Sequence, residues 1–503
     1  MTSSDKEKWE KAMQDEMKSL HENQTYELTE LPQGKRALKN KWVYKIKHKD
    51  YGQKQRYKVR IMVKGCNKKK VVDFEEIFYP VVKMTAVRTA LAMTASLDLK
   101  VEQMNVKTTF LHSNLDEEIY IKQPEGFRAP GCKDLVLITG NTSVKVVILN
   151  RPRKLNSLSH EMICQIKKNL ELYENDSSVK LVILKGNGKA FCAGGDIVSV
   201  ITSALVGHWT YPVSYYKKHL TLDYLIATYK KPIVSLINGV VMGGGAGLSM
   251  NTTFRIVTEK AVFAMPEASI GLFPDVGASY FLSRLPGYFG EYLGLTGARL
   301  EGAEIAASGL ATHFVPSMKL CSLQKALEAV TSSNVSTIAT ITETFTVKAN
   351  VKENSSFRRL KTINKCFSKG TVEEIIQSLE NELEIGAEKW ITNALSSLRS
   401  SCPTSLKIFL KSIRKGRVQN IEQCLHRDYK IASHLLRRTN SNDLYEGSRA
   451  KLFDKDNKPK WEPSQLELVN EEMVDQYFRN VNDEEWESLQ FPDRSHSQKV
   501  SRL

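Results

Sequence analysis

The 503-residue sequence predicts an α/β protein whose C-terminal region is helical and whose N-terminal region is a separate α+β segment. Three observations support this class. Apolar and polar residues alternate over 42–63, short all-apolar runs occupy 144–150, 179–186 and 232–237, and apolar residues recur at helical spacing beyond 316. The first pattern is typical of half-exposed strands, the second of strands buried on both faces, and the third of amphipathic helices.

The N-terminal segment, residues 1–132, contains a predicted two-stranded hairpin around the turn "DYG". Its stretches "LPQGKRALKNKWVYKIK", "RYKVRIMVKG" and "QMNVKTTFLHSNLDEEIYIKQPEGF" resemble the start of the reverse transcriptase of a copia-type retrotransposon. That family binds its catalytic metal ions with acidic residues. Asn105 stands where the family has the first aspartate, and the second motif, Tyr-Val-Asp-Asp, does not occur. The resemblance therefore implies an inactive fragment, and nucleic-acid binding through its basic residues is the alternative.

The composition limits the classes of function. The formal net charge is +16, and because the excess is spread along the chain it is weak support for a nucleic-acid partner. The eight cysteines are scattered without Cys-x-x-Cys or Cys/His spacing suited to zinc, so we expect reduced thiols and no metal site. The most apolar window, residues 232–250, contains five glycines and Asn238, which favours a buried strand and turn over a membrane span.

The rest of the chain divides into three parts. In residues 133–315 the apolar runs alternate with helical stretches, as in βαβ units, and we expect the catalytic core there. Residues 316–490 are expected to be helical: "TVEEIIQSLENELE" opens with a capping box, Thr371 and Glu374, and "LKIFLKSIRKG" and "QLELVNEEMVDQYF" repeat its periodicity. Residues 491–503 form a tail.

Several motifs in the second part occur together and in order. They are "ILNRPRKLNSLS", "LKGNGKAFCAGGDI", "KPIVSLINGVVMGGGAGLSM" and "FAMPEASIGLFPDVGASYFLSRLPG". Because of these motifs, the chain from about residue 135 resembles the crotonase (enoyl-CoA hydratase/isomerase) superfamily. Within that superfamily it resembles the branch that hydrolyses 3-hydroxyisobutyryl-CoA. The resemblance implies a repeated ββα core and an enzyme that splits this thioester, or that of a close short-chain 3-hydroxyacyl-CoA, into free acid and coenzyme A in valine catabolism. An enoyl-CoA isomerase or hydratase is the nearest alternative, and an inactive scaffold or a retroelement-derived nucleic-acid-binding protein are alternatives of another class.

Two glycine-rich turns are candidates for binding the thioester. Hydrolysis creates an oxyanion, which backbone N–H groups fixed in a tight turn can stabilise. By resemblance, the donors are the N–H groups of Ala193 in "FCAGGD" and Gly244 in "MGGGAG". The neighbouring glycines lack a Cβ and let the substrate approach closely, so they are predicted to contact it; they are Gly194, Gly195 and Gly243.

Two acids in "AMPEASIGLFPDVG" are the candidate catalytic residues. Hydratases of the superfamily use two glutamates, and the first of these positions is Gly247 here, while the second is Glu267. Asp275 falls where the hydrolase branch has an acid. We assign Glu267 as general base or nucleophile, and Asp275 as a partner of the substrate 3-hydroxyl or a proton carrier. His219 replaces a glutamate that is common in the hydrolase branch, and it is a second candidate for the hydroxyl.

Two residues beside the first glycine turn have ordinary structural explanations. Asp196 is expected to be a helix N-cap. Cys192 has no activating base near it in the sequence, which indicates a core residue rather than a nucleophile.

The remaining expectations concern ligands and location. We expect no cofactor, because coenzyme A is part of the substrate, and the resemblance leaves a homo-oligomer open. The last residues, Ser501-Arg502-Leu503, are a conservative variant of the Ser-Lys-Leu peroxisomal signal. They predict a peroxisomal location, with the mitochondrion or cytoplasm as alternatives.

Overall fold

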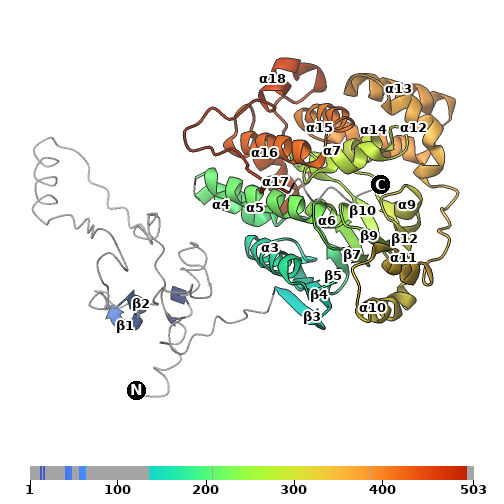
Figure 1. Ribbon diagram of the computed structural model, residues 1–503. Helices are drawn as coiled ribbons and strands as arrows, with labels where there is room; N and C mark the ends of the chain where they lie inside the picture. Colours follow the sequence, from blue (N-terminus) through green and yellow to red (C-terminus); the bar gives the residue numbers. More distant parts are fainter. Residues whose placement is uncertain are drawn as a thin grey trace, which may run out of the picture. The chain divides into compact units, whose positions relative to one another are not determined.

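The computed structural model describes residues 135–494 apart from 207 and 387, together with 40–47, 56–63 and residues 9, 12, 13, 15 and 16. The chain divides into two compact units, Met1–Cys132 and Lys133–Leu503 (Figure 1).

The first unit contains the predicted hairpin. Strands β1 (Asn40–Lys47) and β2 (Arg56–Val63) pair antiparallel, with Trp42 opposite Ile61 and Tyr44 opposite Val59. The alternating pattern of the sequence is therefore confirmed as a pair of strands. Asn105 lies outside the described residues.

A six-stranded sheet forms one half of the second unit. Its order is β12-β9-β7-β5-β4-β3, with all neighbours parallel except β3 and β4. The three all-apolar runs are the adjacent strands β4, β5 and β7, as predicted. The strands are β3 (Val136–Gly140), β4 (Val144–Leu149), β5 (Leu181–Gly186), β7 (Ile233–Ile237), β9 (Phe254–Val257) and β12 (His313–Phe314).

Both faces of this sheet are covered, which explains why its strands are apolar throughout. In β5, Leu181 and Ile183 pack with helices α10 (Leu320–Glu328) and α11 (Val335–Glu343), while Val182 and Leu184 join the core on the other face. Side chains that alternate along a strand thus enter two separate cores.

A four-stranded sheet, ordered β11-β10-β8-β6, carries the candidate site. Strands β6 (Ala190–Cys192), β8 (Val240–Met242) and β10 (Val262–Ala264) are parallel, and β11 (Leu300–Glu301) is antiparallel to β10. In each of the pairs β5-β6, β7-β8 and β9-β10, the first strand joins the large sheet and the second joins the small one. A helix follows each pair, so the repeated ββα core is confirmed.

The helices of the core follow these strands. They are α3 (His160–Asn175), α4 (Ile197–Val206), α5 (Thr210–Ala227), α6 (Gly244–Met250), α7 (Ala278–Phe281), α8 (Phe289–Thr296) and α9 (Gly302–Ala307), with a 3-10 turn, η4, at Glu267–Ile270. None of the helices in the described part of the chain is long and apolar enough to cross a bilayer.

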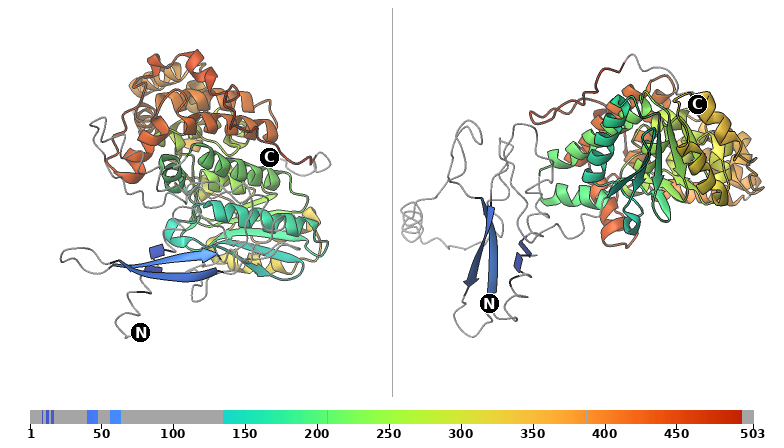
Figure 2. Two further views of the ribbon diagram at one scale, coloured as in Figure 1. Left: turned by 90° about the vertical axis from the view of Figure 1, so that its left-hand side faces the viewer. Right: turned by 60° about the horizontal axis from the view of Figure 1, so that its bottom comes forward.

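Beyond residue 316 the regular elements of the described chain are helices, as predicted, and residues 454–494 are mostly irregular apart from one 3-10 turn and one short helix. Helices α12–α18 lie at the opposite end of the second unit from β3, β4 and β5 (Figures 1 and 2). They are α12 (Leu360–Phe367), α13 (Val372–Ile385), α14 (Lys389–Ser400), α15 (Pro403–Gly416), α16 (Ile421–Arg437), α17 (Asp443–Ser448) and α18 (Glu471–Gln476). The capping box of α13 is confirmed, because Thr371 accepts from the N–H of Glu374 at 3.2 Å.

Two segments differ from the expectation. "QLELVNEEMVDQYF" is a 3-10 turn (Leu466–Leu468) and the six-residue α18 rather than one helix, because Asn470 caps a new helix by accepting from the N–H of Met473 at 2.9 Å. The segment after residue 490 is also not a free tail from its start. Phe491 stacks on Tyr224 with ring centroids 4.3 Å apart, and Arg494 pairs with Glu174.

The helical region is bound to the core by a buried acid. Glu291 of α8 is fully buried, and its carboxylate lies 3.0 Å from Nε of Arg414 and 2.6 Å from Nη2 of Arg417. Because a buried carboxylate is costly unless it is paired, these contacts hold the end of α15 against α8.

Candidate active site

The candidate site lies where three neighbouring parallel strands end. Cys192 of β6 pairs with Val241 of β8, and Met242 pairs with Ala264 of β10. Because parallel strands present their carboxyl ends at one edge, the segments after them meet there. These segments contain the predicted glycine turns and the first predicted acid: Ala193, Gly194, Gly195, Gly243, Gly244 and Glu267.

In the first glycine turn, the backbone N–H group that is free to donate a hydrogen bond is not the predicted one. The N–H of Ala193 donates to the carbonyl oxygen of Leu155 at 3.0 Å, so it is engaged within the protein. The nitrogen of Gly195 lies 3.1 Å from the position that a Cβ on Gly244 would take. Within the described part of the chain, no carbonyl oxygen accepts the N–H of Gly195 or of Gly244. These two neighbouring N–H groups, rather than those of Ala193 and Gly244, are the available donors.

Both turns need glycine for conformational and steric reasons. Gly194 has a φ of 112° and Gly243 a φ of 48°, which are in the left-handed region that side chains disfavour. A Cβ on Gly243 would also lie 2.6 Å from Oε1 of Glu267. The absence of a side chain therefore lets the Glu267 carboxylate approach the second turn.

Glu267 begins the 3-10 turn that follows β10, and it is 6% exposed. Its Oε2 is buried and has no hydrogen-bond partner in the described part of the chain. Burial raises the pKa of this carboxyl well above its ordinary value, and the negative charge of Asp275 raises it further. An acid in such a setting exchanges protons at a higher pH than an ordinary glutamate does.

Asp275 is held in a strained loop. The next residue, Val276, has a φ of 51°, which is unusual for a β-branched side chain, and the N–H of Gly277 donates to Oδ2 of Asp428 at 2.9 Å. Asp428 belongs to α16, so the helical region supports this loop. Burial raises the pKa of Asp275, and the charge of Asp428 raises it further.

His219 faces the second glycine turn from helix α5. Its Cε1 lies 2.6 Å, and its Nε2 3.1 Å, from the position that a Cβ on Gly244 would take. The side chain is 2% exposed, and burial lowers its pKa to about 4, so the ring is neutral at physiological pH. The structure thus brings His219 to the predicted site.

Sequence reasoning missed two acids at this site. Asp223 follows His219 by one turn of α5, and its Oδ1 lies 2.9 Å from the position that a Cβ on Gly247 would take. The side chain is fully buried, and burial and the charges of Asp275 and Asp428 raise its pKa. A single acid in the apolar stretch "LTLDYLIA" was the available signal for Asp223. The sequence contains no signal that relates Asp428 to the site, because Asp428 is about 150 residues from the motifs.

The two structural interpretations beside the first turn are confirmed. Asp196 precedes α4, and its Oδ1 accepts from the N–H of Ser199 at 3.2 Å, as an N-cap does. Cys192 is buried, and burial raises the pKa of its thiol to about 12, so it is protonated and unreactive at neutral pH.

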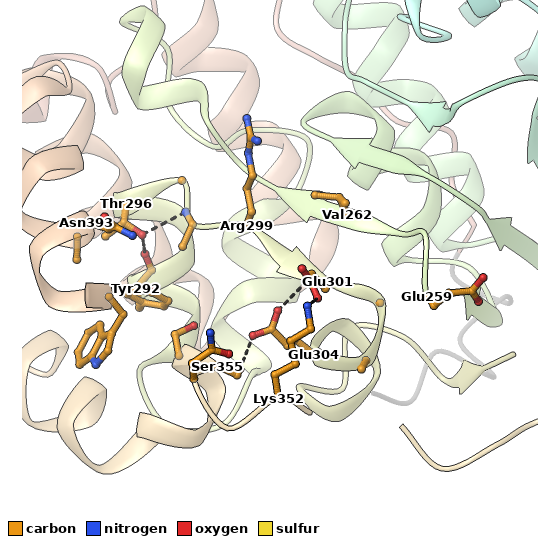
Figure 3. A pocket seen from close by; sticks show the side chains of 18 of the residues that line it. Glu259, Val262, Tyr292, Thr296, Arg299, Glu301, Glu304, Lys352, Ser355 and Asn393 are labelled. Atoms are coloured by element: carbon orange, nitrogen blue, oxygen red, sulfur yellow. Dashed lines mark hydrogen bonds and ion pairs between the residues drawn. The ribbon is translucent and has the colours of Figure 1, made fainter. Parts of the chain in front are cut away.

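A cavity of about 980 Å³ lies beside β11 (Figure 3). Its lining includes Tyr292, Arg299, Lys352 and Trp390 and none of the predicted site residues. Glu301 and Glu304 on its wall are occupied in local contacts, since Lys352 pairs with Glu301 at 2.6 Å and Glu304 caps α9. The acids that line this cavity are engaged in these local contacts and none of the predicted site residues lines it, so we do not assign the chemistry to it.

Comparison with known proteins agrees with this geometry. Residues 144–478 match the family described as Enoyl-CoA hydratase/isomerase, and residues 23–144 match Reverse transcriptase (RNA-dependent DNA polymerase). Both resemblances expected from the motifs are therefore confirmed.

The similar proteins include hydrolases and a dehydratase. Probable 3-hydroxyisobutyryl-CoA hydrolase 3 of Arabidopsis thaliana is 51% identical over 362 residues, which are 72% of this chain and 96% of that protein. Mitochondrial 3-hydroxyisobutyryl-CoA hydrolase of Gallus gallus is 40% identical over 348 residues, covering 68% and 88%. The crystal structure of a carnitinyl-CoA dehydratase from Mycobacterium thermoresistibile has a TM-score of 0.64 and 33% identity, covering 71% of this chain and 98% of that one.

Proposed function

The chain belongs to the enoyl-CoA hydratase/isomerase family, within its 3-hydroxyisobutyryl-CoA hydrolase branch, and from this premise we propose how it acts. It hydrolyses the thioester of 3-hydroxyisobutyryl-CoA, or of a close short-chain 3-hydroxyacyl-CoA, to the free acid and coenzyme A, as a step of valine catabolism. The observation that carries this proposal is the buried Glu267 carboxylate, which faces the glycine turn at Gly243 from the end of β10. No cofactor enters the proposal.

The thioester carbonyl binds between the two glycine turns. Its oxygen accepts hydrogen bonds from the N–H groups of Gly195 and Gly244, and the absence of a side chain at Gly243 keeps the Glu267 carboxylate close to this position. These donors are fixed before the substrate arrives, so they stabilise the negative charge of the tetrahedral intermediate without reorganisation.

Glu267 supplies the attack. As a general base, it takes a proton from water while the water oxygen bonds to the carbonyl carbon. As a nucleophile, its own oxygen bonds to that carbon and forms an anhydride that water then hydrolyses. In either route the C–S bond breaks when the oxyanion collapses, and the thiolate of coenzyme A takes a proton. Asp275 has a raised pKa and is suited to carry that proton.

Replacing Glu267 by Gln tests the proposal. A neutral amide can neither take a proton from water nor form the anhydride, so we expect kcat to fall by about 10²- to 10⁴-fold. Release of the free thiol of coenzyme A from 3-hydroxyisobutyryl-CoA, followed with a thiol reagent, measures the loss.

Glu259→Gln is the matched control, because Glu259 lies at the protein surface, where it accepts from the N–H of Ser317 at 2.8 Å. We expect this variant to keep wild-type activity. A Glu267→Gln enzyme that keeps most of its thioesterase activity would remove the proposed mechanism.

The location is proposed from the end of the chain. Ser501-Arg502-Leu503 lies outside the described residues, and its similarity to the receptor-read Ser-Lys-Leu signal supports the peroxisome. The relative from Gallus gallus is named as mitochondrial, which supports the mitochondrion as the alternative.

A further inference from the structure

Two buried side chains of α5 face each other with unsatisfied polar atoms. Nε2 of His219 and both carboxyl oxygens of Asp223 are buried without a hydrogen-bond partner of normal geometry in the described part of the chain, and the imidazole also interacts with the backbone of Gly244. Nε2 lies 3.8 Å from Oδ2 of Asp223. Buried polar groups in native proteins nearly always have a partner, so three such atoms together indicate that a polar group binds between them.

The spacing identifies the size of that group. A distance of 3.8 Å exceeds the range of a hydrogen bond between nitrogen and oxygen, but it allows one oxygen atom to lie within about 2.8 Å of both. A hydroxyl group fits this arrangement, because it donates one hydrogen bond and accepts another. A larger anion such as a carboxylate would meet the acid of Asp223 at close range.

The neighbouring helix α6 leaves room for the group beside the thioester. His219 contacts α6 at Gly244 and Asp223 contacts it at Gly247, one turn apart on the same face. A Cβ on Gly247 would lie 2.9 Å from Oδ1 of Asp223. The pair therefore lies against the helix whose first N–H is proposed to bind the carbonyl oxygen.

We propose that Asp223 and His219 together bind the 3-hydroxyl of the acyl group and make the enzyme selective for 3-hydroxyacyl thioesters. This inference rests on the proposed hydrolase function and adds Asp223 to the residues that contact substrate. It also gives His219 the substrate hydroxyl as its partner and leaves Asp275 to proton transfer. Burial raises the pKa of the Asp223 carboxyl and lowers that of His219, so both can be neutral, and the protonated carboxyl can then donate to the hydroxyl oxygen while the hydroxyl donates to the imidazole nitrogen.

Two substitutions of Asp223 test the proposal. Asp223→Leu keeps the branching at Cγ but replaces both oxygens by larger methyl groups, whereas Asp223→Asn keeps the size and the ability to hydrogen-bond. The readout is kcat/KM for 3-hydroxyisobutyryl-CoA and for isobutyryl-CoA, which lacks the hydroxyl. For the Leu variant, we expect kcat/KM for 3-hydroxyisobutyryl-CoA to fall about 10-fold or more, while kcat/KM for isobutyryl-CoA changes little. The Asn variant should keep most of the selectivity between the two substrates.

A control on the same helix separates binding from packing. Thr221→Val removes a hydroxyl that only bonds to the carbonyl oxygen of Lys217 at 2.6 Å, and it should leave both values of kcat/KM unchanged. If the Asp223→Leu protein does not fold, the selectivity of His219→Leu decides the question, with the same expected loss.

The outcomes distinguish the two proposals. Equal losses on both substrates, or no loss on either, would overturn the role of Asp223 while the hydrolase function stands. A wild-type protein that releases coenzyme A from neither thioester would instead overturn the proposed function itself.

Discussion

Glu267 and Asp275 interact electrostatically, and this interaction contributes to the raised pKa of the attacking group. Burial is the larger reason for the raised pKa of Glu267, and the charge of Asp275 is the second. Glu267 acts only when deprotonated, so kcat/KM should rise with pH at values above those of an ordinary glutamate.

Asp275→Asn should therefore move this rise to lower pH. The substitution removes a negative charge that disfavours ionisation of Glu267, so the pKa of Glu267 falls toward its ordinary value. The measurement is the pH profile of kcat/KM, whose position is independent of any loss in kcat. Glu259→Gln should leave the profile in place, and a shift of the Asp275→Asn profile to higher pH would contradict the coupling.

Only some of the residues of the candidate active site could be predicted from the sequence. Glu267, Asp275 and Gly244 lie in motifs that can be read along the chain. Gly195 and Ala193 are two residues apart in one turn, and only the hydrogen bond from Ala193 to Leu155 distinguishes which N–H is available. Donor direction depends on backbone angles that the residue types in this turn do not specify.

At the scale of elements, the close approach of α6 to β6 positions the second turn. Gly245, the second residue of α6, lies so near β6 that an added Cβ would come within 2.2 Å of the carbonyl oxygen of Cys192. The apolar strands β6 and β8 and the helix after them were predictable, whereas this contact between helix and strand was not. Its distance is set by packing of distant parts of the chain.

Gly245→Ala should consequently impair both stability and activity. The new methyl group would clash with the backbone of Cys192, which can shift only at a high energetic cost. We therefore expect the free energy of unfolding to fall by about 1–3 kcal/mol. Displacement of α6 also moves the N–H of Gly244, so kcat/KM should fall. Chemical denaturation and the thioesterase assay measure the two effects.

Gly386→Ala is the matched control for that substitution. No heavy atom lies within 4 Å of its added Cβ, and its φ of −167° is accessible to alanine. The free energy of unfolding of the Gly386→Ala protein should stay within about 0.5 kcal/mol of the wild-type value. Equal effects of the two substitutions would show that the contact with Cys192 is not the cause.

At the scale of the whole molecule, the chain joins two units that match different protein families. The match to the hydratase/isomerase family begins at residue 144, and the chain divides into compact units after Cys132. All predicted site residues lie in the second unit, together with Asp428 of the helical region, which supports the Asp275 loop.

A protein of residues 133–503 should therefore retain the activity of the full chain. Its core, its glycine turns and its acids are complete within that unit, so we expect unchanged kcat/KM for 3-hydroxyisobutyryl-CoA. Parallel assays of the full and shortened chains, with thermal melting of both, test this. A large loss of activity in a shortened protein that still melts cooperatively would show that residues 1–132 contribute to function.

The sequence by itself determined the two units, the hairpin, the three buried strands and the helical region, and it identified the glycine turns and the acids Glu267 and Asp275 as candidates. The units and buried strands follow from residue type and periodicity, and the glycine turns and the two acids follow from the resemblance of their motifs to a known family; all of these are read from local stretches of the chain. The tertiary structure alone decided that Gly195 rather than Ala193 offers its N–H, that Asp223 fills the space beside Gly247, and that Asp428 reaches the Asp275 loop. Such contacts join segments far apart in the chain, and their distances follow from packing and burial rather than from any local pattern.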